Sequence, residues 1–394
     1  MKHQYDIVAL VSNDLATDQR MRRCLTSLAK AGYRCLLLGR ELGSSLPLDS
    51  AVPFDQERHR LRRVRGKRFY HELNRAHYQR LLELRPSSIL VVDLDTMWAG
   101  ARAARQLGIP WVYDAHELYV EVPELIGRPV ARAAWQALAK RYIPRAAKCY
   151  TVGEAIATEH QRRYGSAFEV VRNLTDAQPR KFATATEALP SMNGFGDRVD
   201  IKLGGNEGQS SGERPVIIYQ GAVNRGRGLA ALLQLAALTT SLDVWIVGDG
   251  DLLLELQDKA LALSLTNVLF FGQVDPKNLR ELSKQASLGY ALMDGESLNY
   301  HLSLSNKSID YIHAGLPSLQ MDWPEYAAIN EHYGCYTLLA DLDIRPMQAA
   351  VKDMLEPCTY ATMQAACKKA AAELTWANEE HRLVQVWRDV ISPA

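Results

Sequence analysis

Residues able to bind an anion gather after one apolar run in the second half of this 394-residue chain. The run "VIIYQG" leads into "AVNRGRGL", where Arg225 and Arg227 are spaced by glycines. Such glycines leave backbone N–H groups open at the start of a helix, and arginines add fixed charge with bidentate geometry. The loop therefore suits a diphosphate, while a flexible surface turn explains it equally well when it is taken alone.

A second anion-binding pattern stands further along, in "SLNYHLSLSNKSIDYIHAGLP" (297–317). Asn306 can cap the helix that this stretch predicts, and Lys307 can point at an anion held over the helix N-terminus. Asp310, one turn inside the helix, can accept hydrogen bonds from ribose hydroxyls. Its alternative role is that of a carboxylate that only complements the helix dipole.

Two further strand ends offer weaker candidates for the same site. Gly248 and Asp249 follow "LDVWIV", but a tight turn after a strand needs glycine in any case. A dinucleotide fingerprint would need a third glycine, which "DLLLEL" lacks, so an NAD-dependent enzyme is disfavoured. Gln273 and Val274 follow "NVLFFG" and can present backbone groups to a base edge.

The first half of the chain places acids and a histidine after its own apolar runs. "VVDLDT" (91–96) contains Asp95, and "VYDAHELYV" (112–120) contains Asp114, His116 and Glu117. Histidine is the usual proton handler near neutral pH and can also bind a hydroxyl-rich substrate. A lone histidine is more often structural, but this one follows a strand and has acidic residues beside it in the sequence. This context favours a role in a binding or catalytic site. No Ser-His-Asp order, HExxH or P-loop is present.

Strand-like apolar runs alternate with helical segments and must position these residues. This rhythm is typical of parallel, doubly wound sheets, in which ligands bind beyond the carboxyl ends of the strands. It runs from "YDIVALVS" to "KCYTVG", restarts at "PVIIYQG", and predicts an α/β protein with two Rossmann-like domains. We expect an N-terminal domain over 1–175, a flexible linker or insertion over 183–213, a C-terminal domain over 214–376, and a closing helix over 377–394.

Charge is distributed unevenly along the chain although the net charge is only +1. Residues 1–175 hold 28 Lys and Arg against 18 Asp and Glu, whereas the remainder holds 18 against 27. Seven of the basic residues lie between Arg58 and Arg68. A solvated basic loop is one interpretation, and attraction to anionic lipid head groups is the other. Nucleic-acid binding is disfavoured because no recognisable module accompanies the charge.

Cysteine usage and hydropathy limit the cellular compartments in which the protein is expected. The six cysteines are scattered without a CxxC pair, which indicates buried thiols in a reducing environment. No apolar run reaches the length of a signal sequence or a membrane span. We therefore expect a cytoplasmic protein whose membrane contact, where it has any, is peripheral.

Together these residues resemble the GT-B fold glycosyltransferases, in particular the large retaining group known as family 4 or group 1, in a bacterial branch. Four motifs in the same order carry the resemblance over nearly the whole chain: "NDLxxDQR" (13–20), "YDxHELxxEVPEL" (113–125), "YQGxxNxGRGL" (219–229) and "LNY…NKxxDYIxAGxP" (298–317). The resemblance implies two domains facing across a cleft.

The resemblance also implies roles for single residues. A nucleotide-sugar donor would bind mainly to the C-terminal domain, with the acceptor on the N-terminal domain. Arg227 takes the place of the family's diphosphate-binding cation, with Gly221 in the loop before it, and Asp310 that of its ribose-binding acid. His116 falls where the family has a histidine near the donor sugar. Such enzymes typically need neither a cofactor nor a metal.

Two departures from the family pattern stand out. Leu302 occupies the position of the first of two family glutamates, and "NDLATDQR" replaces the glycine-rich loop after the first strand. Asp14 and Arg20 in that segment, with Asp95, Asp114 and Glu117, are our acceptor-side candidates. Either this branch uses other polar residues for the sugar or the site no longer turns over. The substitutes would be Asn299, Tyr300, Asn306 and Lys307.

The sequence thus predicts a retaining, metal-independent hexosyl- or N-acetylhexosaminyltransferase for bacterial surface polysaccharide. Arg225, Arg227 and Lys307 would assist departure of the diphosphate, while His116 orients the sugar or the acceptor. The acceptor would be a glycan or polyprenyl-linked lipid, reached with residues 58–80 on an anionic membrane. The alternatives are a non-catalytic module that binds nucleotide or glycan, or a sugar-nucleotide epimerase.

Overall fold

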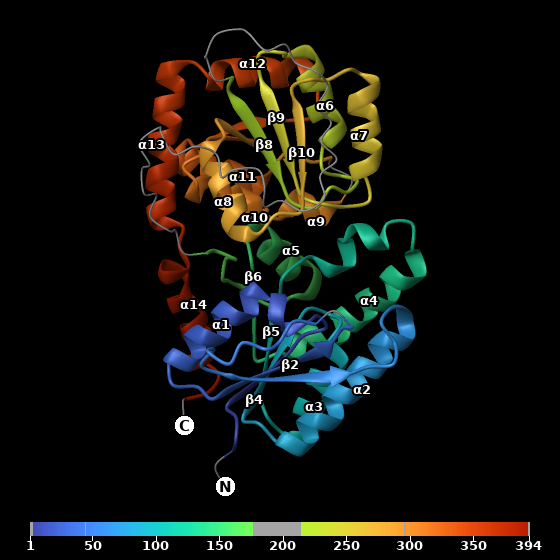
Figure 1. The fold of residues 1–394 in the computed structure, drawn as a ribbon. Coiled ribbons are helices and arrows are strands. Elements are labelled where there is room, and N and C mark those ends of the chain that lie inside the picture. The colour runs from blue at the N-terminus through green and yellow to red at the C-terminus, as the bar shows by residue number, and fades with distance from the viewer. Residues whose placement is uncertain (1–2, 44, 176–213, 295–296, 393–394) are drawn as a thin grey trace. The chain divides into compact units, whose positions relative to one another are not determined.

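The computed structural model describes residues 3–43, 45–175, 214–294 and 297–392, and these residues form two compact units (Figure 1). Unit 1 comprises Met1–Asn173, Ser297–Ser303 and Trp376–Ala394, and unit 2 comprises Leu174–Glu296 and Leu304–Thr375. The predicted linker over 183–213 lies outside the described residues. The two units are considered separately below.

Unit 1 is built on a seven-stranded parallel sheet in the order β3-β2-β1-β4-β5-β6-β7. Its strand β1 is buried at all of its positions because helices cover both faces of the sheet, as is typical of parallel sheets. The strands are β1 (Ile7–Leu10), β2 (Cys35–Glu41), β3 (Asp55–Arg60), β4 (Ser88–Val92), β5 (Trp111–Ala115), β6 (Lys148–Thr151) and β7 (Glu169–Val170).

Alternate residues of the central strands of unit 1 divide the core into two layers. Val8 and Leu10 face α2, α3 and α4, whereas Ile7 and Ala9 face α1 and the C-terminal helix α14. The helices of this unit are α1 (Gln19–Lys30), α2 (Gly66–Leu84), α3 (Met97–Leu107), α4 (Pro129–Tyr142), α5 (Glu154–Tyr164), α9 (Leu298–Leu302) and α14 (Trp376–Arg388). Four 3-10 turns accompany them: η1 (Leu15–Thr17), η2 (Tyr119–Glu121), η3 (Pro123–Leu125) and η4 (Ile143–Arg145).

Helix α14 is part of the unit 1 core although it lies at the end of the chain (Figure 1). Trp376 Nε1 donates to Ser27 Oγ on α1 at 2.9 Å, and the Trp387 ring is completely buried. The Arg172 N–H donates to the Glu379 carboxylate at 2.8 Å. The helix ends at Arg388, short of the predicted 394.

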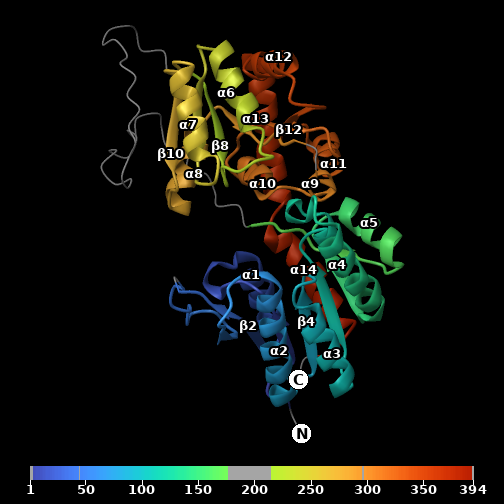
Figure 2. The same ribbon diagram turned by 90° about the vertical axis from the view of Figure 1, so that its right-hand side faces the viewer.

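Unit 2 contains a six-stranded parallel sheet in the order β10-β9-β8-β11-β12-β13. Its strands are β8 (Val216–Gln220), β9 (Asp243–Val247), β10 (Val268–Gly272), β11 (Leu288–Tyr290), β12 (Ser318–Met321) and β13 (Tyr336–Leu339). Its helices are α6 (Leu229–Leu238), α7 (Leu253–Ala262), α8 (Pro276–Gln285), α10 (Asn306–His313), α11 (Pro324–Tyr333), α12 (Ile344–Met354) and α13 (Pro357–Glu373). Figure 2 shows this unit turned by a quarter rotation. Apolar residues of α8 and α10 cover one face of the sheet.

Both sheets reverse their strand order beside the first strand, which fixes where a ligand can bind. The reversal falls between β1 and β4 in unit 1 and between β8 and β11 in unit 2. In open α/β sheets, ligands bind beyond the carboxyl ends of the strands at this switch point. The predicted class of two doubly wound α/β domains is therefore observed, and the sites must be sought at these two edges.

The basic segment between Arg58 and Arg68 is not a single loop. Its first residues form the edge strand β3, and its last residues begin α2 at Gly66. Arg58 donates to Asp14 at 2.6 Å, and Arg60 donates to Glu41 at 2.5 Å. The other five basic residues are exposed and make no ion pair with a described acid: Arg62, Arg63, Arg65, Lys67 and Arg68.

Two general expectations can be compared with the fold. Five of the six cysteines are buried free thiols, but Cys358 is exposed, so the prediction of burial is wrong for that residue. Among the described residues, no helix combines the length and the apolarity that a bilayer crossing requires.

Candidate active site

The loops after β8 and β9 in unit 2 pack together closely, and their glycines meet either a steric or a backbone requirement. A Cβ atom at Gly248 would lie 1.9 Å from the carbonyl oxygen of Gly221. Gly221 has a φ of +123° and donates its N–H to the Val247 carbonyl at 2.9 Å. Both glycines therefore meet a geometric requirement, and the Gly221 backbone remains exposed at the carboxyl edge of the sheet.

Lys307 on α10 lies beside this loop. A Cβ atom at Gly221 would be 3.8 Å from its Cε, and its Nζ lies 4.2 Å from the centroid of the Tyr219 ring. The Nζ atom is shielded from solvent and has no hydrogen-bond partner among the described residues. Burial, with the charge of Arg227, lowers the pKa of Lys307 to about 7. An ammonium group has three hydrogens to donate, so this one is available to an anion.

The two arginines of the glycine-rich loop lie in different environments. Arg227 is partly buried, and its Nη1 donates to Met293 Sδ at 3.4 Å, whereas Arg225 is exposed. A Cβ atom at Gly228 would lie 2.7 Å from the Leu292 carbonyl oxygen, so the loop approaches the chain after β11 closely. Arg227 thus lies at the switch point of the unit 2 sheet. Its charge acts on Lys307, the other cation that the sequence analysis assigns to an anion.

Asp310 is held at the end of β8. Its Oδ2 accepts from Gln220 Nε2 at 3.1 Å, and the buried Gln220 accepts in turn from Ser283 Oγ at 2.8 Å. The Asp310 side chain is otherwise exposed. The cap prediction for Asn306 is wrong, because Ser305 is the N-cap residue of α10 and Asn306 is its exposed first helical residue.

The remaining donor-side candidates of unit 2 lie at the ends of β9 and β10. Asp249 is exposed, and its Oδ1 accepts from the Gly250 N–H at 2.7 Å. Its backbone oxygen accepts from Val223 N–H at 2.9 Å, which joins the two loops. Gln273 is exposed, whereas Val274 packs against the core of unit 2.

Unit 1 holds a charged network at the carboxyl end of β5. His116 Nε2 lies 2.9 Å from Asp114 Oδ2, and Arg20 Nη2 donates to Asp114 Oδ1 at 3.1 Å. Arg20 also donates to the Val171 carbonyl at 3.2 Å, which joins α1 to the chain after β7. Asp114 is completely buried, while 22% of the His116 side chain is exposed. The histidine is therefore the member of the network that a ligand can reach.

Two more carboxylates follow β4 beside this histidine. Asp93 Oδ1 accepts from the His116 backbone N–H at 2.9 Å, and Ser12 donates its hydroxyl to Asp95 Oδ2 across the switch point. Asp93 has a φ of 54°, a left-handed backbone conformation that is uncommon for a non-glycine residue. Such strain is often found at functional sites.

Burial and charge–charge interactions shift the pKa values of the three carboxylates and the histidine in different directions. Burial alone would raise the pKa of Asp114, but the charges of Arg20 and His116 lower it to about 2. Burial would lower the pKa of His116, but Asp114 and Asp93 raise it to about 8. Burial, opposed by His116, raises the pKa of Asp93 to about 8 and that of Asp95 to about 6. The site thus retains protons near neutral pH.

Other sequence-predicted candidates have structural partners. Asp14 is buried, accepts from Ala16 N–H at 2.9 Å as the cap of η1, and pairs with Arg58. Asn299 is buried in unit 1, where its Oδ1 accepts from Leu118 N–H at 2.8 Å. Its neighbour on α9 is Tyr300, which also belongs to unit 1, and Glu117 is exposed. The predicted donor residues therefore divide between the two units.

Sequence reasoning missed Asp93, Ser12 and Gln220 as members of these clusters. Their shared signal is position, because each lies at or within two residues of the carboxyl end of a strand. No three His, Cys, Asp or Glu side chains of the described residues are arranged to hold a metal ion. The clusters can bind anions in unit 2 and handle protons or hydroxyl groups in unit 1.

Known structures with this fold include several glycosyltransferases. Anabaena HepE in complex with UDP matches with a TM-score of 0.70 and 16% identity, covering 97% of this chain and 99% of that one. Sucrose-phosphate synthase from Thermosynechococcus elongatus matches with a TM-score of 0.75 and 16% identity, covering 97% and 98%. WaaG, a glycosyltransferase involved in lipopolysaccharide biosynthesis, matches with a TM-score of 0.64 and 14% identity, covering 96% and 99%. The fold is therefore GT-B.

Sequence comparison adds the family to the fold. Residues 19–178 match the family model of Glycosyltransferase Family 4, which confirms the resemblance for the part of the chain that contains the "YDxHELxxEVPEL" motif. No curated protein matches the chain by sequence. The chain therefore has the GT-B fold, and residues 19–178 are similar to a glycosyltransferase family.

Proposed function

We propose that the protein is a retaining glycosyltransferase that uses a nucleotide-diphosphate sugar. The observation that carries this proposal is the shielded Lys307 ammonium, which lies beside Gly221 and near the charge of Arg227 without a hydrogen-bond partner among the described residues. The Tyr219 ring face stabilises this cation in part, but it offers no hydrogen-bond acceptor, and an anionic ligand would supply one. A diphosphate fits because Lys307 and Arg227 can each bind one phosphate group.

The structural neighbours suggest which donor to test first. Structures of HepE contain UDP in one case and UDP-glucose in another. We therefore propose a UDP-linked hexose or N-acetylhexosamine as the donor class. Asp310, exposed and held by Gln220, would accept hydrogen bonds from the ribose hydroxyls.

The proposed chemistry rests on leaving-group stabilisation. As the glycosidic bond to the diphosphate breaks, negative charge develops on the leaving oxygen, and preorganised cations stabilise it. Lys307, Arg227 and the N-terminus of α10 would supply this positive potential without a metal ion, and Arg225 would approach from the surface. The acceptor hydroxyl would attack from the same face and pass its proton to the leaving diphosphate oxygen, so that the anomeric configuration is retained.

The unit 1 network is proposed to serve the sugar and the acceptor. Protonated His116, held by Asp114, can donate a hydrogen bond to a sugar or acceptor oxygen. Asp93 lies beside it and is 19% exposed, so it is also accessible to a hydroxyl group. Arg20 and Asp114 are positioning residues because both are buried.

The acceptor is proposed to be a glycan or polyprenyl-linked lipid for bacterial surface polysaccharide, presented at the cytoplasmic face of the membrane. The support is charge: five basic residues between Arg62 and Arg68 are exposed, and Val64 between them is 62% exposed. Basic residues beside an exposed apolar side chain favour an anionic bilayer surface.

Donor hydrolysis tests the proposal directly. We expect the purified protein to release UDP from a UDP-sugar, and Arg227→Ala to lower this release by about tenfold or more because a charge-assisted hydrogen bond is lost. Exposed Arg280→Ala, also in unit 2, is the matched control and should retain activity. Tight UDP binding without turnover on any donor or acceptor would instead favour the non-catalytic module suggested by Leu302. Isomerisation of the donor without an acceptor would indicate an epimerase.

A further inference from the structure

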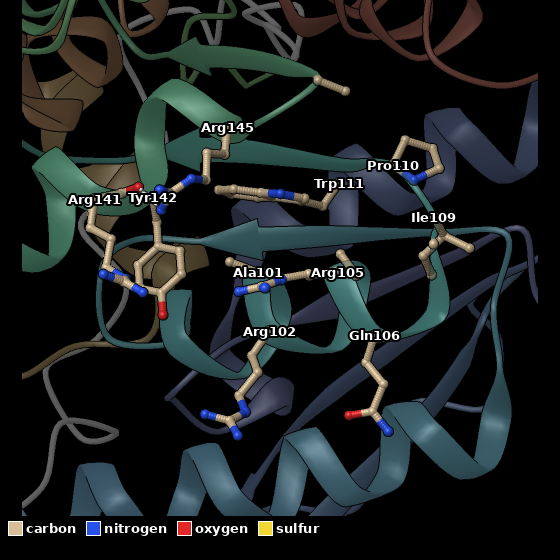
Figure 3. A pocket seen from close by; sticks show the side chains of 13 residues that line it. Ala101, Arg102, Arg105, Gln106, Ile109, Pro110, Trp111, Arg141, Tyr142 and Arg145 are labelled. Carbon is tan, nitrogen blue, oxygen red and sulfur yellow. Dashed lines mark hydrogen bonds between the residues drawn. The ribbon is translucent and has the colours of Figure 1, made fainter.

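A pocket of about 940 Å³ opens in unit 1 at the amino ends of β5 and β6. Figure 3 shows Arg102 and Arg105 of α3, Arg141 of α4 and Arg145 of the turn η4 lining it together with Trp111. Trp111 begins β5, whereas His116 follows the other end of the same strand. The pocket is therefore separate from the candidate active site of unit 1.

The four arginines of this pocket have no acidic partner. None of them forms an ion pair with a described Asp or Glu, and no acidic residue lines the pocket. Instead, aromatic rings lie beside three of the guanidinium groups, those of Arg102, Arg141 and Arg145. Arg102 lies 5.2 Å from the Trp98 ring centroid, while Arg141 and Arg145 lie 5.6 and 6.0 Å from the Tyr142 ring.

Helix dipoles account for only part of this charge. Both α3 and α4 end at the pocket, and a helix C-terminus carries about half a negative charge. Two such ends offset about one positive charge, so the pocket keeps a net positive charge, carried by guanidinium groups that are all exposed to solvent. Arg145 Nη1 donates to the Arg141 carbonyl oxygen, and this contact helps to keep both guanidinium groups beside the Tyr142 ring.

We propose that this pocket binds a ligand that carries phosphate groups, with Arg102, Arg105, Arg141 and Arg145 as its ligands. Guanidinium groups bind phosphate oxygens through paired N–H donors, and several arginines that line one pocket fit a diphosphate better than a single charge. The phosphate belongs either to a free molecule or to a lipid head group. Both sources would present phosphate oxygens to the same arginines, and the experiment below distinguishes between them.

The test uses the full chain and inorganic pyrophosphate as the probe, measured by isothermal titration calorimetry. The variant Arg141→Gln/Arg145→Gln removes two charges from the pocket, and both side chains are exposed, so folding is expected to be unaffected. The matched control Arg280→Gln/Arg345→Gln removes two exposed charges from unit 2. Thermal denaturation of all three proteins verifies that they are equally folded.

We expect the pocket variant to bind pyrophosphate at this site at least tenfold more weakly than the wild type, with the control unchanged. UDP binding should be the same in all three proteins, so failure of the donor-site proposal would be visible separately. Equal pyrophosphate binding by wild type and pocket variant would overturn the inference. An equal loss in the pocket variant and the control would also overturn it, because net charge alone would then be responsible.

Vesicle sedimentation distinguishes the source of the phosphate. The probes are phosphatidylcholine vesicles with and without phosphatidylglycerol. A lipid source predicts that the pocket variant loses binding to the anionic vesicles and that pyrophosphate competes with them. A free ligand predicts vesicle binding that is the same for wild type and pocket variant, while pyrophosphate binding still depends on the arginines.

Discussion

Under the proposed function, the shielded ammonium of Lys307 predicts that donor binding depends on pH. Burial and Arg227 lower the pKa of this side chain to about 7, whereas an exposed lysine has a pKa of about 10.4. A bound diphosphate favours the charged form and therefore raises the pKa again. Binding must then be accompanied by proton uptake above neutral pH, and affinity must fall as the pH rises.

We predict that UDP affinity decreases between about pH 7 and pH 9, by up to tenfold per pH unit for one proton taken up. Lys307→Arg should remove this dependence because a guanidinium group does not titrate in this range, and Lys307→Met should weaken binding at all pH values. Titration calorimetry in buffers of different ionisation enthalpy measures the proton uptake. A pH-independent wild type would contradict the assignment of Lys307.

In unit 1, Asp114 and His116 share a hydrogen bond but differ in their predicted roles. Asp114 is completely buried between Arg20 and His116, so Asp114→Asn leaves the Arg20 charge buried without its partner. We predict a loss of about 3–5 kcal/mol in the free energy of unfolding, measured by urea denaturation. His116→Gln should cost less stability but should lower turnover without weakening UDP binding. Equal stability losses for both variants would mean that His116 is only structural.

Some site residues could be predicted from the sequence, whereas others depend on burial and on contacts between distant residues. Lys307, Arg227 and His116 were predicted as site residues from residue type and from position after apolar runs. Asp93 was missed although it directly follows β4, because its importance depends on a left-handed backbone and on contact with His116. Asn299 was expected at the donor site, but its side-chain oxygen accepts from Leu118 in unit 1. Such pairings depend on tertiary contacts that sequence spacing does not encode.

At the scale of elements, the apolar strands were predictable and the polar edge strand was not. Strands such as β1 and β8 are continuous apolar runs because both faces of a parallel sheet are covered. Strand β3 reads "DQERHR" and lies at the sheet edge, where one side of the backbone has no neighbouring strand and polar side chains are tolerated. The basic segment was therefore interpreted as a loop. The structure instead places Arg58 and Arg60 in strand β3, where each forms an ion pair with an acid.

The contact between the β8 and β9 loops offers a prediction at this scale. A Cβ atom at Gly248 would overlap the Gly221 carbonyl oxygen at 1.9 Å, whereas Gly272 has nothing within 4 Å. Both glycines have positive φ, 140° and 64°, so Gly272→Ala controls for backbone strain. We expect Gly272→Ala to cost about 1–2 kcal/mol and Gly248→Ala to cost more and to weaken UDP binding. Thermal denaturation and calorimetry provide both measurements, and equal effects would exclude a special role for the loop contact.

At the scale of the whole molecule, the charge asymmetry leads to a prediction about membranes. Five exposed basic residues flank Val64 in unit 1. Replacing Arg62, Arg63 and Arg65 with Gln should reduce sedimentation with vesicles that contain phosphatidylglycerol, and added salt should reduce it for the wild type. UDP binding should not change. Vesicle binding that depends neither on lipid charge nor on these three arginines would contradict the membrane proposal.

The division of the chain has a consequence for how such proteins can be recombined. The two units consist of five segments in sequence, so the backbone passes between them four times, after Asn173, Glu296, Ser303 and Thr375. A chimaera with a single junction near residue 174 would therefore exchange α9 and α14 together with the donor half. Asn299 would then leave Leu118 without its acceptor, and Trp376 and Trp387 would leave the α1 face uncovered. Functional hybrids between relatives should require that residues 297–303 and 376–394 travel with the N-terminal half.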